Sequence, residues 1–295
     1  RHINRLIAPT EGEIWVDGED VLKMSPGALR EFRRFKVSMV FQKFALFPHR
    51  TIKENVGYGL ENQGADSAKI KTTCDHWINR VGLNGFENHY PSQLSGGMQQ
   101  RVGLARALAT DAEILLMDEA FSALDPLIRT EMQDVLLDLQ NELEKTIVFI
   151  THDLDEALRI GDNIAILRDG EIVQTDDPQN ILMNPANSYV SEFMKDINRA
   201  RVLRVRAIMK PLEESDKGPV VKGSMTIEAA MQILAESSSD RLIITDRKGV
   251  KVGRLTIEDL IRGMRRPTSA EIQADAQAEA LVEAVAETEA AVISS

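Results

Sequence analysis

The segment from residue 94 to residue 125 constrains the fold of this chain more than any other. Ser95, Gly96 and Gly97 form a turn before a helical stretch, and the apolar run Ile-Leu-Leu-Met that follows ends in Asp118 and Glu119. Backbone N–H groups at a helix N-terminus favour phosphate oxygens. A carboxylate at a strand end can hold Mg²⁺, and a second one beside it can orient an attacking water. A lone Ser-Gly-Gly sequence is usually only a turn, but the combination indicates phosphate and magnesium chemistry.

The segments around the two carboxylates predict an α/β core. Glu113–Met117 and Thr146–Ile150 have the composition of buried strands, and Leu127–Glu144 between them has the pattern of an amphipathic helix. This order is a βαβ unit, which implies neighbouring parallel strands and a right-handed crossover. Two short strands are expected nearer the N-terminus, at Glu13–Val16 and Val37–Phe41, and Asp169-Gly170 between apolar runs predicts a hairpin.

The segment from residue 94 to residue 125 resembles three consecutive motifs of ABC-type ATPases, namely the signature motif, the Walker B motif and the D-loop. The resemblance implies an α/β fold with a P-loop NTPase (ABC ATPase) core at residues 1–195 and a helical subdomain at about residues 51–110. It further implies that Ser95, Gly96 and Gly97 bind the γ-phosphate of an ATP held mainly by another subunit. Sites shared in this way require a head-to-tail homodimer.

The same resemblance implies roles for the acidic residues. Asp118 would help to bind Mg²⁺ and the nucleotide, Glu119 would polarise the hydrolytic water, and Asp125 would lie at the dimer seam. An Asp-Glu pair alone is more often a solvated acidic pair at a strand end. The neighbouring signature motif favours the catalytic interpretation.

Two further residues match motifs of this family. Gln42, after Val-Ser-Met-Val-Phe, resembles the Q-loop glutamine, whose amide reaches Mg²⁺ or the attacking water. His152, in Thr-His-Asp after a predicted strand, resembles the switch histidine that contacts the γ-phosphate and holds the catalytic glutamate. A glutamine can follow a strand for many reasons, and a lone histidine is usually structural. The resemblance implies Glu119, His152 and Gln42 as catalytic residues, with ATP and Mg²⁺ as cofactors and with Mg²⁺ bound by Asp118 and Gln42.

One expected motif is missing from the sequence. No Gly-x-x-x-x-Gly-Lys-[Ser/Thr] occurs in the chain, although this phosphate loop supplies the lysine that grips the β- and γ-phosphates. Residues Arg1–Gly18 resemble the sequence that directly follows the loop in ABC ATPases. We therefore expect the chain to begin just after the loop, and we expect this fragment alone to hydrolyse ATP negligibly.

The region after about residue 201 has a different character. Thr226–Glu236 and Ile257–Met264 have helical patterns, and two strands are expected between them, which predicts a small α+β module at residues 201–266. The module resembles one CBS motif, in which Thr256 and Asp259 would contact a nucleotide. A dimerisation module and an unrelated α+β extension are the alternatives. Residues 267–295 are rich in Ala and Glu, and we expect an acidic, disordered tail there.

Composition excludes several classes of protein. The 295 residues suggest about two domains, and the net charge of −11 argues against nucleic acid as a partner. The single cysteine, Cys74, excludes internal disulfides and suits a reducing compartment. No apolar run approaches the ~18–20 residues that span a bilayer, so membrane association must come through a partner protein.

Within the ABC class, the segments around Gln42, Ser95 and Glu119 are similar to those of glycine betaine/proline betaine importer ATPases. That family implies a bacterial importer with two ATPase subunits, two integral-membrane permease subunits and a periplasmic or extracellular solute-binding protein. The ATPase subunit would lie peripherally on the cytoplasmic face of the inner membrane. An importer of polar amino acids or other small solutes, and a non-catalytic regulatory protein derived from an ABC ATPase, are the alternatives.

Overall fold

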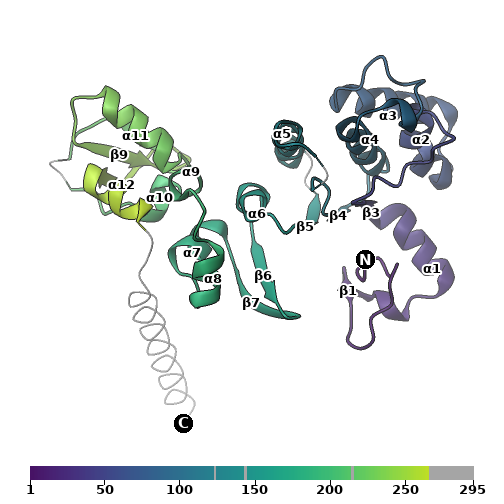
Figure 1. The fold of residues 1–295 in the computed structure, drawn as a ribbon, viewed down its shortest axis with the longest axis horizontal. Helices are drawn as coiled ribbons and strands as arrows, with labels where there is room; N and C mark the ends of the chain where they lie inside the picture. Colours follow the sequence, from purple (N-terminus) through teal and green to yellow (C-terminus); the bar gives the residue numbers. More distant parts are fainter. Residues whose placement is uncertain (123, 143–144, 214–215, 266–295) are drawn as a thin grey trace, which may run out of the picture. The chain divides into compact units, whose positions relative to one another are not determined.

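The structure is a computed structural model that describes residues 1–122, 124–142, 145–213 and 216–265. The chain divides into two compact units, one from Arg1 to Asp153 and one from Leu154 onward, and each is described by itself (Figure 1). The acidic tail expected at residues 267–295 lies outside the described residues. No helix among the described residues is both long enough and apolar enough to cross a membrane.

The first unit alternates short strands with helices. In chain order its elements are β1 (Trp15–Val16), β2 (Glu19–Asp20), the 3-10 helix η1 (Val21–Lys23), α1 (Pro26–Glu31), the π-helix η2 (Phe32–Lys36), β3 (Val37–Val40), α2 (Ile52–Gln63), α3 (Ser67–Arg80), the 3-10 turn η3 (Pro91–Gln93), α4 (Gly96–Ala109), β4 (Ile114–Asp118), α5 (Pro126–Glu142) and β5 (Thr146–Ile150).

A parallel sheet of three strands forms the centre of this unit, in the order β3-β4-β5. Val37 pairs with Ile114 on one side of β4, and Ile114 pairs with Thr146 on the other. The middle strand is buried because its residues Leu115, Leu116 and Met117 are apolar on both faces of the sheet. The predicted parallel pairing of the two strands on either side of α5 is confirmed, and all three strands end at the same edge of the sheet.

The helical segment of the first unit confirms the helical pattern predicted from residue 51 to residue 110. Thr51 and Glu54 form a capping box at the start of α2, Asp66 caps α3, and Ser95 caps α4. Gly64 ends α2 in the left-handed conformation that glycine adopts without steric cost. The side chains that α2, α3 and α4 share are buried and apolar, among them Val56, Ile78 and Leu104.

The second unit contains two small sheets and several short helices. In chain order its elements are α6 (Leu154–Ile160), β6 (Ile164–Arg168), β7 (Glu171–Asp176), α7 (Pro178–Met183), α8 (Ser188–Phe193), α9 (Arg199–Val202), α10 (Val205–Ile208), β8 (Val220–Lys222), α11 (Ile227–Glu236), β9 (Arg241–Thr245), β10 (Lys251–Thr256) and α12 (Ile257–Met264). The predicted hairpin is confirmed as β6 and β7, which are joined at Asp169 and Gly170.

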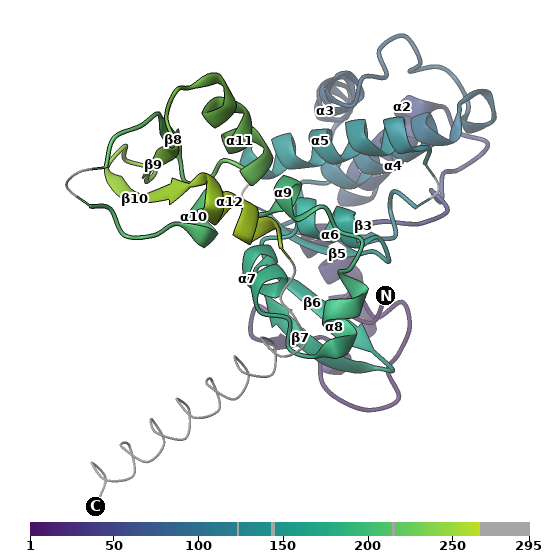
Figure 2. The same cartoon turned by 60° about the vertical axis from the view of Figure 1, so that its left-hand side comes forward.

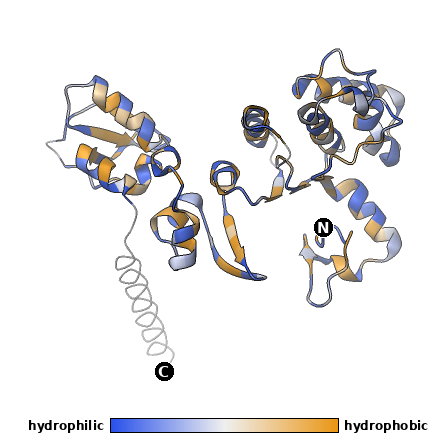
Figure 3. Ribbon diagram, viewed as in Figure 1, coloured by the Kyte–Doolittle hydropathy of each residue, from blue (hydrophilic) through white to orange (hydrophobic). Residues whose placement is uncertain are grey.

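One hydrophobic cluster runs through the second unit. It joins Leu158 and Ile181 from the first part of this unit to Leu242 and Leu260 from its last part, and Figure 3 shows β9 as largely hydrophobic along its length. The residues predicted to close the ATPase domain therefore share a core with the small α+β module. The domain boundary placed near residue 195 stays a prediction.

The sequence pattern did not predict the strands β2 and β8 or the short helices α6, α9 and α10, whereas β1 lies within the strand expected at Glu13–Val16. β1 and β2 are two residues each, joined by Asp17 and Gly18 in the left-handed conformation, and β8 pairs in parallel with β9 over three residues. Strands of this length contain too few residues to show an alternating pattern. The strands at Arg241–Thr245 and Thr146–Ile150 and the helix at Ile257–Met264 have the predicted bounds.

Candidate functional site

The carboxyl ends of the three parallel strands carry the residues predicted to be catalytic. Gln42 follows β3, Glu119 follows Asp118 at the end of β4, and His152 follows β5. Parallel strands in neighbouring positions bring these ends to one edge of the sheet, which is where ligands bind in open α/β sheets. The sequence separates the three segments, and the strand order brings them together.

Gln42, Glu119 and His152 converge on a single oxygen atom. The side-chain amide Nε2 of Gln42 donates a hydrogen bond to Oε2 of Glu119 at 2.7 Å. Nδ1 of His152 lies 3.5 Å from the same Oε2. The Glu119 side chain is 32% exposed and that of His152 is 69% exposed, so the group is open to a molecule from solvent.

The backbone at Glu119 has an unusual conformation. Its φ of 45° is in the left-handed region, which residues with a Cβ rarely adopt. Its N–H donates to the carbonyl of Ile150 at 2.9 Å, and its carbonyl accepts from the Ser122 hydroxyl at 3.0 Å. Such conformations persist where neighbouring contacts impose them, and they cluster at functional sites. The turn after β4 thus fixes the direction in which the Glu119 carboxylate points.

Asp118 sits beside a positive charge. Its Oδ2 lies 2.8 Å from Nε of Arg1, and its side chain is 22% exposed. Arg1 and Asp118 line a small hollow together with Met39 and Ile150. No group of three or more histidine, cysteine, aspartate or glutamate side chains that could enclose a metal occurs among the described residues.

This donor set fits Mg²⁺ better than it fits a metal with a complete protein cage. Magnesium usually binds through one or two carboxylates together with phosphate oxygens and water. Asp118 supplies one carboxylate, and the hydrogen bond through Nε2 of Gln42 leaves the amide oxygen of that residue as an acceptor. Asp118 and Gln42 therefore fit the predicted magnesium role chemically.

His152 is presented by a turn that a distant arginine supports. The Thr151 hydroxyl accepts the Asp153 N–H at 3.0 Å, and Oδ2 of Asp153 pairs with Nη1 of Arg129 at 2.8 Å. Arg129 also donates to the carbonyl of Leu124 at 3.4 Å, so it joins the histidine turn to the segment before α5. Sequence analysis missed Arg129, because no local pattern connects it to Asp153, 24 residues further along the chain.

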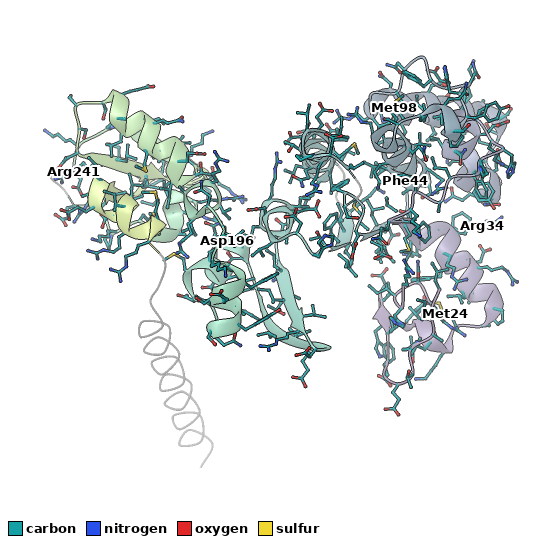
Figure 4. The ribbon with its side chains drawn as sticks, in the orientation of Figure 1. Met24, Arg34, Phe44, Met98, Asp196 and Arg241 are labelled. Carbon is teal, nitrogen blue, oxygen red and sulfur yellow. The ribbon has the colours of Figure 1, made fainter. Side chains whose placement is uncertain are left out.

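Ser95, Gly96 and Gly97 form the predicted turn at the start of α4. The Ser95 hydroxyl accepts the N–H of Met98 at 3.3 Å, and Ser95 and Gly96 are exposed. Figure 4 labels Met98 in the first turn of α4 and Phe44 on the loop after β3. None of the described hydrogen bonds connects this turn with Glu119, so the structure does not bring the two predicted groups together within the chain.

Helix packing also explains why residue 97 is a glycine. A Cβ on this residue would lie 2.7 Å from Cγ2 of Ile128, closer than real Cβ contacts come, whereas a Cβ on Gly96 would meet its nearest atom, Cζ of Phe44, at 3.9 Å. α5 runs past α4, as Figure 2 shows. Gly97 lets these two helices approach, a role that the phosphate argument did not predict.

Asp125 lies at the start of α5 and caps it. Its Oδ1 accepts the N–H groups of Leu127 and Ile128, both at 3.1 Å. Asp125 is exposed, and the neighbouring Leu127 is 69% exposed. The predicted position at a dimer seam stays a prediction, but the local geometry leaves this end of the helix open to another chain.

In the second unit, Thr256 and Asp259 are already engaged with their own chain. They form a capping box at the start of α12, and Oδ1 of Asp259 lies 2.6 Å from Nζ of Lys210. Burial raises the pKa of the Asp259 carboxyl, but the hydrogen bonds from Lys210 and Thr256 outweigh burial and lower that pKa below its ordinary value. Both oxygens of this carboxylate therefore have a structural role, whatever else they bind.

Comparison with known proteins gives matches over most of the chain. The ABC transporter family model matches residues 1–122. The glycine betaine transport ATP-binding protein OpuAA of Bacillus subtilis is 53% identical over 270 residues, which are 88% of this chain and 64% of the relative. ProV of Escherichia coli, a glycine betaine/proline betaine transport system ATP-binding protein, is 46% identical over 88% of this chain and 64% of its own length.

A third relative matches over a larger share of its own length. The trimethylamine N-oxide transport system ATP-binding protein TmoW of Pelagibacter ubique is 46% identical over 86% of this chain and 74% of the relative. Among solved structures, a dimeric post-hydrolysis state of an ATP-binding cassette bound to ADP and Pi matches with a TM-score of 0.55 and 35% identity, over 60% of this chain and 78% of that one. The chain spans less than two thirds of the length of OpuAA and ProV.

Proposed function

The chain belongs to the family of ABC transporter ATP-binding proteins, and from that membership we propose that it forms the ATP-hydrolysing part of an importer for glycine betaine, proline betaine or a related quaternary amine. The observation that carries the enzymatic part of this proposal is the convergence of Gln42 and His152 on Oε2 of Glu119. A carboxylate held in this way has the geometry of a base that orients a water for attack on a phosphate.

Each of the three side chains has a distinct task in this proposal. Glu119 accepts a hydrogen bond from the attacking water and draws its proton as the new bond forms. The amide of Gln42 holds the carboxylate by its Nε2–H, and His152 limits its rotation from the other side. Two positioned neighbours reduce the entropy lost when the water aligns with the phosphate.

Two groups of residues would hold the nucleotide and its metal, one at the carboxyl ends of the strands and one at the turn that starts α4. Asp118 and the amide oxygen of Gln42 would bind Mg²⁺, which when bound neutralises charge that develops on the transferred phosphoryl group. Ser95, Gly96 and Gly97 would offer N–H groups at the start of the 14-residue helix α4 to a γ-phosphate held by the partner subunit. Asp125, exposed at the start of α5, would lie at the seam between the two subunits.

The substrate and the partners of the complex are proposed by analogy with the relatives. OpuAA and ProV are named for transport of glycine betaine, and TmoW for transport of trimethylamine N-oxide, all small methylated nitrogen compounds. We place the chain as a homodimer on the cytoplasmic face of a bacterial inner membrane, bound to permease subunits that receive solute from a binding protein. The solute itself would contact those partners and not this chain.

The small module at residues 201–266 is proposed to regulate transport as a CBS-like unit. The module shares a hydrophobic core with β6 and β7, which supports this idea. A conformational change caused in the module by a ligand or by ionic strength would be transmitted to that hairpin through the packed side chains. Deletion of residues 201–295 from the assembled transporter should abolish its activation by salt. Activation that survives the deletion intact would rule out this role.

The enzymatic proposal is tested with an N-terminally extended chain that carries the expected phosphate loop. This chain should hydrolyse ATP only in the presence of Mg²⁺, and Glu119→Gln and His152→Ala should each lower kcat by about 100-fold or more. His76→Ala is the matched control, because His76 is an exposed histidine on α3, and its activity should equal that of the parent.

Two results would contradict the enzymatic proposal. The first is an extended chain that binds ATP but never turns it over, which would favour the regulatory alternative. The second is a Glu119→Gln variant with parental kcat, which would remove this carboxylate from the chemistry. Substantial Mg²⁺-dependent turnover by residues 1–295 alone would overturn the expectation that the phosphate loop is required.

A further inference from the structure

The loop that follows β3, here called the 41–51 loop, contains two adjacent residues in an unfavourable backbone conformation. Phe44 has a φ of 56° and Ala45 a φ of 49°, both in the left-handed region. A side-chain Cβ makes this region unfavourable, so two consecutive non-glycine residues adopt it only when other contacts impose it. The loop begins next to Gln42, whose amide contacts Glu119, so whatever imposes its shape also bears on the candidate site.

An arginine in the last turn of α4 supplies that constraint. Nη1 of Arg106 donates to the carbonyl of Ala45 at 2.6 Å, and Nη2 donates to the carbonyl of Phe44 at 2.9 Å. The two hydrogen bonds hold the carbonyls of the two left-handed residues on the same side, facing the helix. The planar fork of a guanidinium can make both bonds at once, which an ammonium cannot do in the same geometry.

The electrostatic setting of Arg106 is also informative. Burial lowers the pKa of its guanidinium, and the acceptors that the structure gives for Arg106 are backbone carbonyls. A half-buried cation without a carboxylate partner needs neutral acceptors for its N–H groups. The backbone carbonyls of the 41–51 loop fill that role, so this loop and the arginine stabilise each other.

A buried asparagine fixes the other end of the same loop. Asn55 on α2 is fully buried, accepts the N–H of Phe47 at 2.8 Å, and donates to the carbonyls of Phe47 and Arg50 at 3.1 Å. The loop is therefore attached at both ends to helices of the first unit. The ring of Phe44 lies next to Gly96 at the start of α4.

We propose that Arg106 is a positioning residue that sets the orientation of Gln42 toward Glu119 by clamping the left-handed turn at Phe44 and Ala45. This inference rests on the proposed function, since Gln42 acts on a catalytic Glu119 only if the protein hydrolyses ATP. Arg106 touches neither nucleotide nor water in this role. It acts through the backbone of the 41–51 loop.

The test uses Arg106→Lys, which keeps the charge but cannot donate to both carbonyls in the same geometry. In residues 1–295, amide hydrogen exchange over residues 43–47 should accelerate by about tenfold or more, because at least one of the two charge-assisted hydrogen bonds is lost. Exchange in β4 and in the body of α4 should stay at the parental rate. Arg101→Lys, on the same helix but bonded to Val81 and Glu131, is the matched control and should leave loop exchange unchanged.

A rescue and a kinetic measurement separate positioning from general destabilisation. Ala45→Gly relieves the left-handed strain, so in the Arg106→Lys background it should restore part of the lost exchange protection. In the extended chain, Arg106→Lys should lower kcat for ATP by about tenfold while KM stays within about twofold, and Ala45→Gly should recover part of the loss.

The outcomes distinguish this proposal from the enzymatic one. Unchanged loop exchange in Arg106→Lys, or acceleration spread equally through α4 and β4, overturns the clamp. Accelerated loop exchange with a parental kcat shows that the clamp does not reach Gln42, and it also overturns the proposal. If no extended chain hydrolyses ATP, the proposed function fails, while the exchange measurement still decides whether Arg106 holds the loop.

Discussion

At the scale of single residues, the candidate site depends on how one carboxylate oxygen is shared. Oε2 of Glu119 accepts a hydrogen bond from Nε2 of Gln42 at 2.7 Å, and it lies 3.5 Å from Nδ1 of His152. A hydrogen bond from a neutral amide holds the carboxylate in place without a permanent positive charge beside it. The hydrogen bond limits the rotation of the carboxylate, and a general base has to point at the proton that it takes.

Asp259 shows the opposite use of a carboxylate. Its side chain is 4% exposed and pairs with Lys210, and hydrogen bonds lower its pKa in the folded state below the ordinary value of 3.8. A carboxyl whose folded-state pKa is depressed stabilises the fold above its unfolded-state pKa. That stabilisation is lost as the pH falls through the folded-state pKa.

Asp259→Asn should therefore lower the free energy of unfolding at pH 7 by about 1–3 kcal/mol, because Lys210 and the helix cap lose a charged acceptor. The difference in free energy of unfolding between parent and variant should shrink as the pH falls below 3.8, because the parental carboxyl then loses its charge. Urea unfolding followed by circular dichroism at several pH values measures both effects. A difference between the two proteins that stays constant from about pH 7 down to the folded-state pKa and below it would contradict this assignment.

At the scale of elements, helix starts and strand ends supply the functional groups. Ser95 caps α4 and Asp125 caps α5, and both residues were predicted to contact nucleotide or partner because of the motifs around them. Each cap pairs one or two of the four N–H groups that lack a partner within the helix, and the N–H groups that remain can meet an anion or another chain. In these two helices the structural and the proposed functional requirements coincide.

The contact between α4 and α5 gives a prediction about packing. Gly97→Ala should lower the free energy of unfolding by about 1–3 kcal/mol, because its Cβ would meet Cγ2 of Ile128 at 2.7 Å. Gly96→Ala is the matched control and should be close to neutral, since its nearest contact would be at 3.9 Å. Ile128→Ala should reduce the cost of Gly97→Ala in a double-mutant cycle. Equal effects of the two glycine substitutions would refute the predicted clash.

The regular elements could be predicted from the sequence because their signals are local. Apolar runs predicted β4, β5 and β9, and the Asp169-Gly170 pair predicted the β6–β7 hairpin. Family motifs gave Gln42, Glu119 and His152. These signals need only a few neighbouring residues to be recognised.

The supporting residues could not be predicted in this way. Arg129 contacts Asp153 across 24 residues, and Arg106 contacts Ala45 across 61 residues. Neither arginine differs in local sequence from one that is solvated on a helix. Only the folded arrangement of the sheet and helices brings each of them to its partner.

At the scale of the whole molecule, the chain offers one half of each proposed site. The Ser95 turn and the Glu119 group are both accessible to solvent, and no described hydrogen bond connects them. Asp125 and the exposed Leu127 lie at the start of α5, open to another chain. Two copies arranged head to tail would complete two sites, each with a Glu119 from one subunit and a Ser95 turn from the other.

Nucleotide-dependent dimerisation of the extended chain carrying Glu119→Gln tests this arrangement most directly. With ATP and Mg²⁺, light scattering after size exclusion should give the mass of a dimer, with about one ATP retained per subunit because hydrolysis no longer opens the interface. Adding Ser95→Arg, which places a bulky side chain at the shared turn, should return the protein to a monomer. A Glu119→Gln protein that binds ATP and stays monomeric at every concentration would contradict the shared-site account.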